Sequence, residues 1–389
     1  MLRRNAHVAA AALMLAACSD ATRPTAPAPD SDLSTSAGSA EQALRLGRAG
    51  AVYVLTNAAT GNDVAVFRRA ADGTLTAAGR FATGGEGTGA GLGSQNAVVL
   101  SHGGRLLFAV NAGSNEVSAF IVLLGRLLLV STVPSGGTQP VSLTVHDNLL
   151  YVLNAGGAGN ITGFRIGFLG TLTPIAESTR DLSGDATAPA QIEFSPNGRL
   201  LVVTERATNL ILTYAVNRRG LPGEAVAHPS AGMTPFGFAF GRRGELIVSE
   251  AFGGAPDQSA ASSYTVGRDG ELEVVSASVP TTETAACWFV VTDNGRFAYT
   301  TNTGSGSISA YLVGRDGSLT LRDEDGRTAM TGGGSTPIDV AVSRNSRFLY
   351  ALAGGNGTVA AFRIESDGGL TPIAGGSGLP AGAVGLAAE

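Results

Sequence analysis

The chain has 389 residues, of which 55 are glycine and only 15% are charged, and its net charge is −5. Every basic residue is arginine and none are clustered, which argues against nucleic acid as a partner, because phosphate binding needs concentrated positive charge. The absence of lysine excludes Schiff-base chemistry.

The first residues have the features of a targeting segment. Arg3 and Arg4 precede a short apolar stretch over residues 8–15, and Leu15-Ala16-Ala17-Cys18 resembles a bacterial lipobox. We therefore expect residues 1–17 to be a lipoprotein signal peptide and Cys18 to be lipidated. An ordinary signal peptide with an incidental cysteine is the alternative. Ser19 favours sorting to the outer membrane, so the predicted location is the bacterial cell envelope, with a lipid anchor in the membrane and the chain in the periplasm.

Residues 18–48 are rich in Ala, Ser, Thr, Pro and Asp. This composition is typical of a flexible tether, because it offers too little apolar surface to form a core. The globular part is expected over residues 49–389.

One phrase recurs along that part at intervals of roughly 45–55 residues, the length of a four-stranded propeller blade. Each copy is a short apolar strand ending in a polar residue, a small turn, an alternating strand, and then a second turn that in most copies is of the Asp-Gly type. The first strands contain Val54-Leu55-Thr56-Asn57, residues 108–111, 151–154, 201–205, 246–250, 299–302 and 349–352. No helical period of useful length occurs, so the sequence predicts an all-β fold, a seven-bladed β-propeller.

Each blade should run from strand a at the central channel to strand d at the rim. The repeat contains six candidate a strands, which are residues 97–101, 141–145, 191–194, 236–240, 288–291 and 338–342. The seventh is predicted at residues 383–387, which would close the ring as the inner strand of blade 1 and remove its open edges. The loops b–c and d–a then share one face, called the top, and the loops a–b and c–d share the bottom.

The phrase at residues 54–57, with Gly61-Asn62 and the turn Ala71-Asp72-Gly73, resembles the lactonase-like seven-bladed propellers. That family includes 6-phosphogluconolactonases and 3-carboxymuconate lactonizing enzymes, and the resemblance implies a site at the channel mouth. Family members tend to carry histidines ahead of the fourth inner strand, where this chain has residues 188–191 without a histidine. They also carry an acidic segment where this chain has Thr204-Glu205-Arg206.

Polar residues end several b strands, and all of these ends should meet at the top of the channel. Glu205, Arg206 and Glu250 are the candidate catalytic residues, with Arg206 holding a carboxylate and a glutamate acting as acid or base. The candidate ligand-binding residues are Asn111, Asn154, Asn302 and Gln191. Side chains of these kinds also bond loop backbone, so a purely structural role is the alternative.

No spacing of His, Cys and Asp predicts a metal site, and no cofactor is expected. The glycine-rich stretch over residues 84–93 has no helix after it, so it lacks the N–H array of a phosphate-binding loop. We interpret it as a mobile loop.

The c–d turns of blades 2 and 3 are apolar where most others are charged, and they predict an exposed patch at Leu123, Leu124, Phe168 and Leu169. A membrane or protein partner at blades 2–3 is expected there. Two functions stay open: an envelope lipoprotein that binds, hydrolyses or cyclises a small anionic lactone or sugar acid, and a non-catalytic propeller that serves as a protein-interaction module.

Overall fold

The computed structural model describes residues 49–389. The signal peptide over residues 1–17, the tether over residues 18–48 and the lipidated Cys18 are predictions that lie outside the described residues. Within the described part, the strands form seven sheets, each with its strands in sequence order except the first. No described helix is long and apolar enough to cross a membrane.

The seven sheets are the seven blades, and the strands below are given from the innermost outward. Blade 1 has β30 (Val384–Ala388), β1 (Gly50–Leu55), β2 (Asp63–Arg69) and β3 (Leu75–Ala82). Blade 2 has β4 (Val98–Leu100), β5 (Leu106–Asn111), β6 (Glu116–Leu123) and β7 (Arg126–Pro134). Blade 3 has β8 (Pro140–His146), β9 (Leu149–Asn154), β10 (Asn160–Ile166) and β11 (Leu172–Pro174), with β12 (Arg180–Asp181) also on β10. Blade 4 has β13 (Pro189–Phe194), β14 (Leu200–Glu205), β15 (Leu210–Val216) and β16 (Pro222–Pro229).

Blades 5 to 7 repeat the same order. Blade 5 has β17 (Pro235–Phe240), β18 (Leu246–Glu250), β19 (Ala260–Val266) and β20 (Leu272–Pro280). Blade 6 has β21 (Ala286–Val291), β22 (Phe297–Asn302), β23 (Ser307–Val313) and β24 (Leu319–Leu321), with β25 (Ala329–Met330) also on β23. Blade 7 has β26 (Pro337–Val342), β27 (Phe348–Ala353), β28 (Thr358–Ile364) and β29 (Leu370–Gly376).

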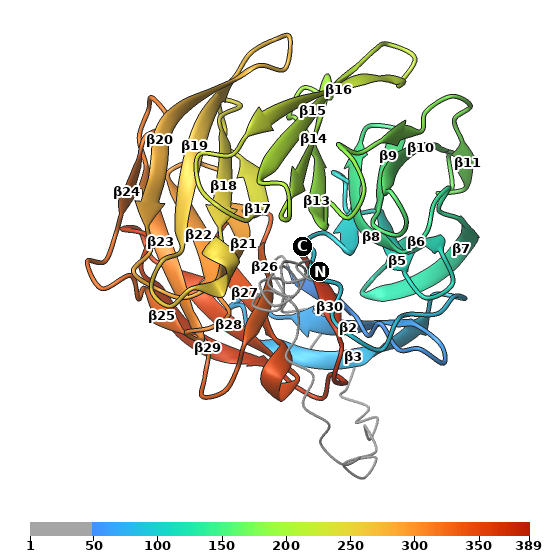
Figure 1. Ribbon diagram of the computed structural model, residues 1–389. Helices are drawn as coiled ribbons and strands as arrows, with labels where there is room; N and C mark the ends of the chain where they lie inside the picture. Colours follow the sequence, from blue (N-terminus) through green and yellow to red (C-terminus); the bar gives the residue numbers. More distant parts are fainter. Residues whose placement is uncertain (1–48) are drawn as a thin grey trace, which may run out of the picture.

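The blades surround a central axis, and the strands of blade 1 come from both ends of the propeller (Figure 1). Strand β30 pairs with β1, so that Val54 faces Leu386, and the backbone N–H of Glu389 donates to Ala51 O at 2.9 Å. The predicted fold, the seven inner strands and the closure of the ring by the C-terminal strand are all confirmed. The whole ring is made of residues 49–389, so this part of the chain contains every contact that closes it.

Neighbouring blades are joined at the bottom through tyrosines of the b strands. The hydroxyl groups of Tyr151, Tyr299 and Tyr350 each donate to a glycine carbonyl in the c–d turn of the next blade, at 2.6, 2.9 and 2.8 Å. Gly73 accepts the last of these bonds and has a φ of 92°, which favours glycine. The Asp-Gly turn of one blade and the tyrosine of its neighbour therefore form a single contact between the two blades.

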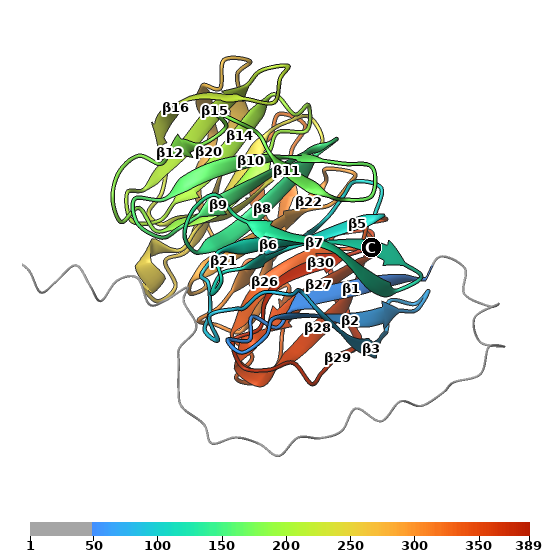
Figure 2. The ribbon, with the colours of Figure 1, turned by 90° about the vertical axis from the view of Figure 1, so that its right-hand side faces the viewer.

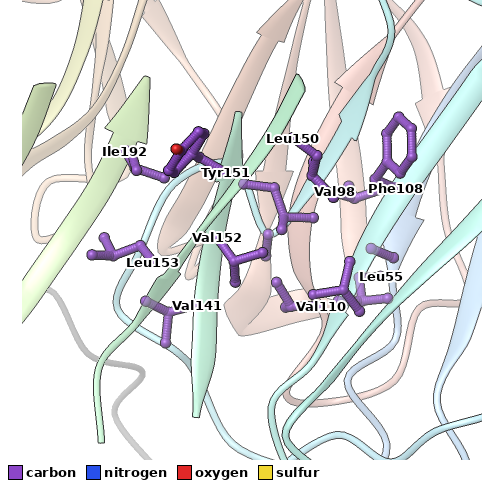
Figure 3. Close-up of a cluster of buried hydrophobic side chains, with 14 of the residues drawn as sticks. Leu55, Val98, Phe108, Val110, Val141, Leu150, Tyr151, Val152, Leu153 and Ile192 are labelled. Atoms are coloured by element: carbon purple, nitrogen blue, oxygen red, sulfur yellow. The ribbon is translucent and has the colours of Figure 1, made fainter. Parts of the chain in front are cut away.

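Apolar side chains fill the space between the blades. Figure 3 shows Leu55, Val110, Val141, Tyr151 and Ile192 from blades 1 to 4 in one buried cluster. The alternation along each strand places these residues on the faces that meet the neighbouring blades. Packing of one sheet on the next therefore supplies the core, and no blade has a core of its own.

The inner strands are joined to one another mainly by side chains. The N–H of Ile192 donates to Ser142 Oγ at 3.1 Å, and the amide of Gln191 bonds both the N–H and the carbonyl of Phe238 at 2.8 Å. These bridges satisfy backbone groups on the channel edge that have no neighbouring strand to pair with.

Deletion of residues 382–389 should lower the melting temperature by more than about 10 °C, because it removes the inner strand of blade 1 and leaves an open sheet edge. Differential scanning calorimetry measures this. Glu389→Ala is the matched control, since it keeps β30 and its backbone bonds. A truncated chain that melts with the full chain would show that closure does not hold the ring.

Candidate functional site

The three asparagines expected at the channel mouth are fully buried. Asn111 Nδ2 donates to Ser118 Oγ at 2.8 Å, and Asn302 Nδ2 donates to Ser309 Oγ at the same distance. Asn154 Nδ2 donates to Asn160 Oδ1 at 2.8 Å. Each amide thus ties the end of a b strand to the c strand of its own blade.

The two glutamates at equivalent positions are also buried completely. Glu205 accepts from the backbone and the hydroxyl of Ser183 at 3.0 and 2.5 Å, and from Thr208 Oγ1 at 2.7 Å. Glu250 accepts from Gly232 N and from the hydroxyl groups of Ser262 and Ser278. Burial raises the pKa of Glu250, although these three donors oppose the shift.

The expectation that these side chains form one open ring is therefore wrong. Each of the five is enclosed at the top end of its own blade, because hydroxyl and backbone groups of the c strand and the d–a loop cover it. Gln191, the fourth predicted ligand-binding residue, is fully buried as well. Its side-chain amide bonds the backbone of Phe238, and its Nε2 also donates to Glu193 Oε2 at 2.8 Å. Whether any of them acts in catalysis or binding stays a prediction.

A segment of the chain itself fills the upper channel. Ser94, Gln95 and Asn96, in the long loop between β3 and β4, form hydrogen bonds with the inner strands of blades 3, 4 and 6. Gln95 bonds both N–H and carbonyl of Phe289 at 2.8 and 2.7 Å, and its own N–H donates to Ala190 O at 3.0 Å. The indole N–H of Trp288 donates to Ser94 O at 2.8 Å. We call residues 92–97 the plug.

The glycine-rich stretch that leads into the plug is fixed on both sides. Asn57 bonds Thr88 through both ends of its amide and donates to Ala90 O at 2.6 Å, and Gly113 N donates to Glu86 O at 2.9 Å. The interpretation of residues 84–93 as a mobile loop is therefore wrong. The glycines allow close backbone approach here, not mobility.

Arg206 lies where the plug meets blade 4. Its Nε donates to Ala188 O at 3.0 Å, and its guanidinium carbon is 5.1 Å from the centre of the Phe236 ring. That ring in turn packs on Trp288, with the ring centres 4.9 Å apart. A side chain at Gly93 would meet Nη1 at 3.0 Å, so glycine makes room for the guanidinium against the plug.

The charge of Arg206 is not neutralised within the described residues. No carboxylate there forms an ion pair with it, and its Nη1 and Nη2 donate no hydrogen bond. Burial lowers its pKa to about 10, so it stays charged at neutral pH. Of the predicted catalytic residues, Arg206 is the one whose polar atoms remain available to a ligand.

Two acidic residues of the inner strands were missed by the sequence reasoning. Burial raises the pKa of Glu193 to about 8 and holds the pKa of Asp339 well above its usual range. Asp339 Oδ2 is buried and has no hydrogen-bond partner among the described residues. Both lie within otherwise apolar inner strands, at residues 191–194 and 338–342, and an acidic residue in such a strand is the sequence pattern that could have indicated them.

An open hollow of about 630 Å³ lies at the top between blades 1 and 2, away from Arg206. Asp63, Glu86 and Glu116 line it, so its charge does not suit an anion. In the part of the chain that the structure describes, no group of three His, Cys, Asp or Glu side chains could hold a metal ion.

Comparisons with known proteins agree with the geometry of the ring. The family model described as a seven-bladed β-propeller lactonase matches residues 48–181 and 169–251. A putative 6-phosphogluconolactonase from Bacteroides fragilis has 19% identity and a TM-score of 0.67, over 87% of this chain and 97% of that chain. A periplasmic gluconolactonase from Pseudomonas aeruginosa has 16% identity and a TM-score of 0.67, over 86% and 98%. No curated protein matches the chain. At such identities the solved structures show a common fold.

Gln95→Leu should lower the free energy of unfolding by about 2–4 kcal/mol, because it leaves the N–H and carbonyl of Phe289 buried without partners. Urea denaturation of this variant and of Gln258→Leu, an exposed glutamine, measures the difference. If both variants unfold at the wild-type urea concentration, the plug does not contribute to stability.

Glu193→Gln should flatten the pH dependence of stability. The pKa of Glu193 is about 8 in the folded chain and has an ordinary value of 4.5. The folded state thus holds the proton more tightly, so its contribution is full below about pH 4.5 and is lost as pH rises to about 8. Urea denaturation at several pH values across this range gives the free energy of unfolding as a function of pH. This free energy should change less with pH for the variant than for wild type or for Glu324→Gln, a control at an exposed position. An unchanged slope would contradict the assignment.

Proposed function

The chain belongs to the seven-bladed β-propeller lactonase family, and on that basis we propose that it binds a small anionic sugar acid, or the lactone of one, beside Arg206 at the upper end of its channel. The observation that carries the proposal is a half-buried, positively charged guanidinium with two nitrogens that have no hydrogen-bond partner among the described residues.

The setting of Arg206 favours a carboxylate or a phosphate as the group that it holds. A guanidinium offers two parallel N–H donors at a spacing that fits two oxygens of such a group. Phe236 and Ala188 already fix the orientation of the side chain, so little conformational entropy remains to be lost on binding. The aromatic pair of Phe236 and Trp288 is fully buried, so it holds the guanidinium in place without contacting a ligand.

Two structures of the same fold support a sugar acid or its lactone as the class of ligand. One is a putative 6-phosphogluconolactonase and the other a periplasmic gluconolactonase, and both names refer to the lactone of a sugar acid. The predicted signal peptide and Cys18 suit such a role in the cell envelope.

Hydrolysis of a bound lactone would be a further step beyond binding. It needs an acid or base, and Glu205 and Glu250 would have to give up their bonds to Ser183, Ser262 and Ser278 to serve. Their enclosure favours the second candidate function, a propeller that binds without catalysis and presents its surface to other proteins.

Isothermal titration with 6-phosphogluconate, gluconate and neutral glucono-δ-lactone tests the binding. We expect the anions to bind more tightly than the neutral lactone, and Arg206→Gln to weaken anion binding at least about tenfold, because a charge-assisted pair of hydrogen bonds is lost. Arg206→Lys should recover part of the affinity.

Arg315→Gln is the matched control, since this arginine is exposed in a bottom turn. If wild type takes up none of the three compounds, or if Arg206→Gln binds anions as wild type does, the proposed site is wrong. Release of acid from the lactone, followed with wild type in a pH-stat, separates an enzyme from a binding protein.

A further inference from the structure

Large apolar side chains are exposed at the bottom of two adjacent blades. Leu123 and Leu124 are 53% and 101% exposed, and Phe168 and Leu169 are 92% and 56% exposed. These four residues, which we call the apolar turns, belong to the c–d turns of blades 2 and 3. Strands β6, β7, β10 and β11, which carry them, lie side by side in Figures 1 and 2. The exposure predicted from the sequence is confirmed.

The geometry of the turns keeps these side chains outside the core. Leu124 and Gly125 form a two-residue turn with φ of 49° and 77°, and such a turn has no length to fold back on the blade. Gly170 packs so close to Leu106 of blade 2 that a side chain there would meet Leu106 at 2.9 Å, which holds the second turn against its neighbour. The two turns thus keep their apolar side chains at the surface of adjacent blades.

Unpaired arginines surround the apolar turns. Seven arginines lie in or beside the bottom turns of blades 1 to 4, and none of them forms an ion pair with a described carboxylate. They are Arg68, Arg105, Arg126, Arg165, Arg199, Arg218 and Arg219. The acids in or beside the same turns are fewer, namely Asp72, Asp147 and Glu389. This part of the bottom face therefore has an excess of positive charge, although the whole chain has a net charge of −5.

The bottom of blades 5 to 7 has nearly as many acids as arginines in its turns. Its turns alternate arginine with acid, as in Arg268-Asp269-Gly270-Glu271 and Arg315-Asp316, and ion pairs join Arg243 to Glu245 and Arg363 to Glu365. Basic charge and apolar exposure thus occur together on one half of one face.

The chain enters the propeller on that same face. Gly50, the first residue of β1, pairs with Arg69 at the end of β2, just before the c–d turn of blade 1. Residues 19–48 separate this point from Cys18, and the tether predicted for them from composition would span about 30 Å. An anchor at Cys18 would therefore hold the bottom of blade 1, and with it the neighbouring blade 2, close to a bilayer.

We propose that the bottom edge of blades 1 to 4 lies on an anionic lipid bilayer, with the apolar turns inserted between headgroups and the arginines in contact with lipid phosphates. Leucine and phenylalanine at turn tips suit the interfacial region, and a ring of uncompensated arginine suits anionic headgroups. A second copy of the chain offers the same excess of arginine and would be repelled. In this pose the top face, with Arg206, points away from the membrane.

Residues 49–389 without the anchor can test the surface directly, since this part contains the whole closed ring. Co-sedimentation with vesicles of equal parts phosphatidylcholine and phosphatidylglycerol should show binding that falls with added salt, and pure phosphatidylcholine should bind much less. Replacement of all four apolar turn residues with serine should reduce binding at least about tenfold, and each of Arg105→Gln and Arg126→Gln by about fivefold.

Met233→Ser with Met330→Ser is the matched control, since Met233, in a d–a loop, and Met330, in β25, are 53% and 55% exposed away from the bottom turns. This control should bind as wild type does, and all variants should melt alike because the changed residues are exposed. The proposal fails if wild type does not bind the anionic vesicles, if the four serines leave binding unchanged, or if ultracentrifugation shows a dimer that the four serines dissolve.

Discussion

The structure depends on how seven inner strands satisfy their channel-facing backbone groups. Each inner strand pairs with its own blade on one side and has no strand on the other, so its free N–H and carbonyl groups need partners. Side chains supply several of them, since Gln191 reaches Phe238 and Ser142 reaches Ile192. Gln95 does the same for Phe289 from a loop. The ring is held at its narrowest point by polar side chains that bond backbone.

This requirement explains why so few of the polar residues at the top remain available for chemistry. An inner strand or a b-strand end that carries Asn, Gln or Glu looks like part of a ligand site, yet the same residue types are the ones that bond backbone and hydroxyl groups best. The side chains of Asn111, Glu205 and Glu250 are all hydrogen-bonded to serine hydroxyl groups in this way. Arg206 differs because a guanidinium has five donors and the surroundings accept from only one nitrogen. Its side chain is half-buried and has no counterion among the described residues, so its two outer nitrogens stay available to a ligand.

The two faces of the ring differ in a way that follows from their loops. The top carries the long d–a loops, which fold inward, cover the b-strand ends and fill the channel. The bottom carries short hairpin turns, whose side chains have nowhere to go but outward. Leu92, in the top loop that forms the plug, is therefore buried, whereas Leu124, at the tip of a bottom turn, is fully exposed.

The sequence by itself determined the all-β class, the seven blades, the inner strands and the closing strand, because these depend on local alternation, on turn residues and on counting strands. It also determined the exposure of Leu124 and Phe168, since a short hairpin turn fixes the direction of its tip side chains without reference to distant residues. It did not determine which polar residues stay open. That depends on contacts such as Gln95 with Phe289 and Asn57 with Thr88, between segments far apart in the chain. Only the closed ring decided that the glycine-rich stretch is held by hydrogen bonds, that Glu205 and Glu250 are enclosed, and that Arg206 keeps two free nitrogens. Burial and hydrogen-bond partners are properties of the packed blades and not of any one strand.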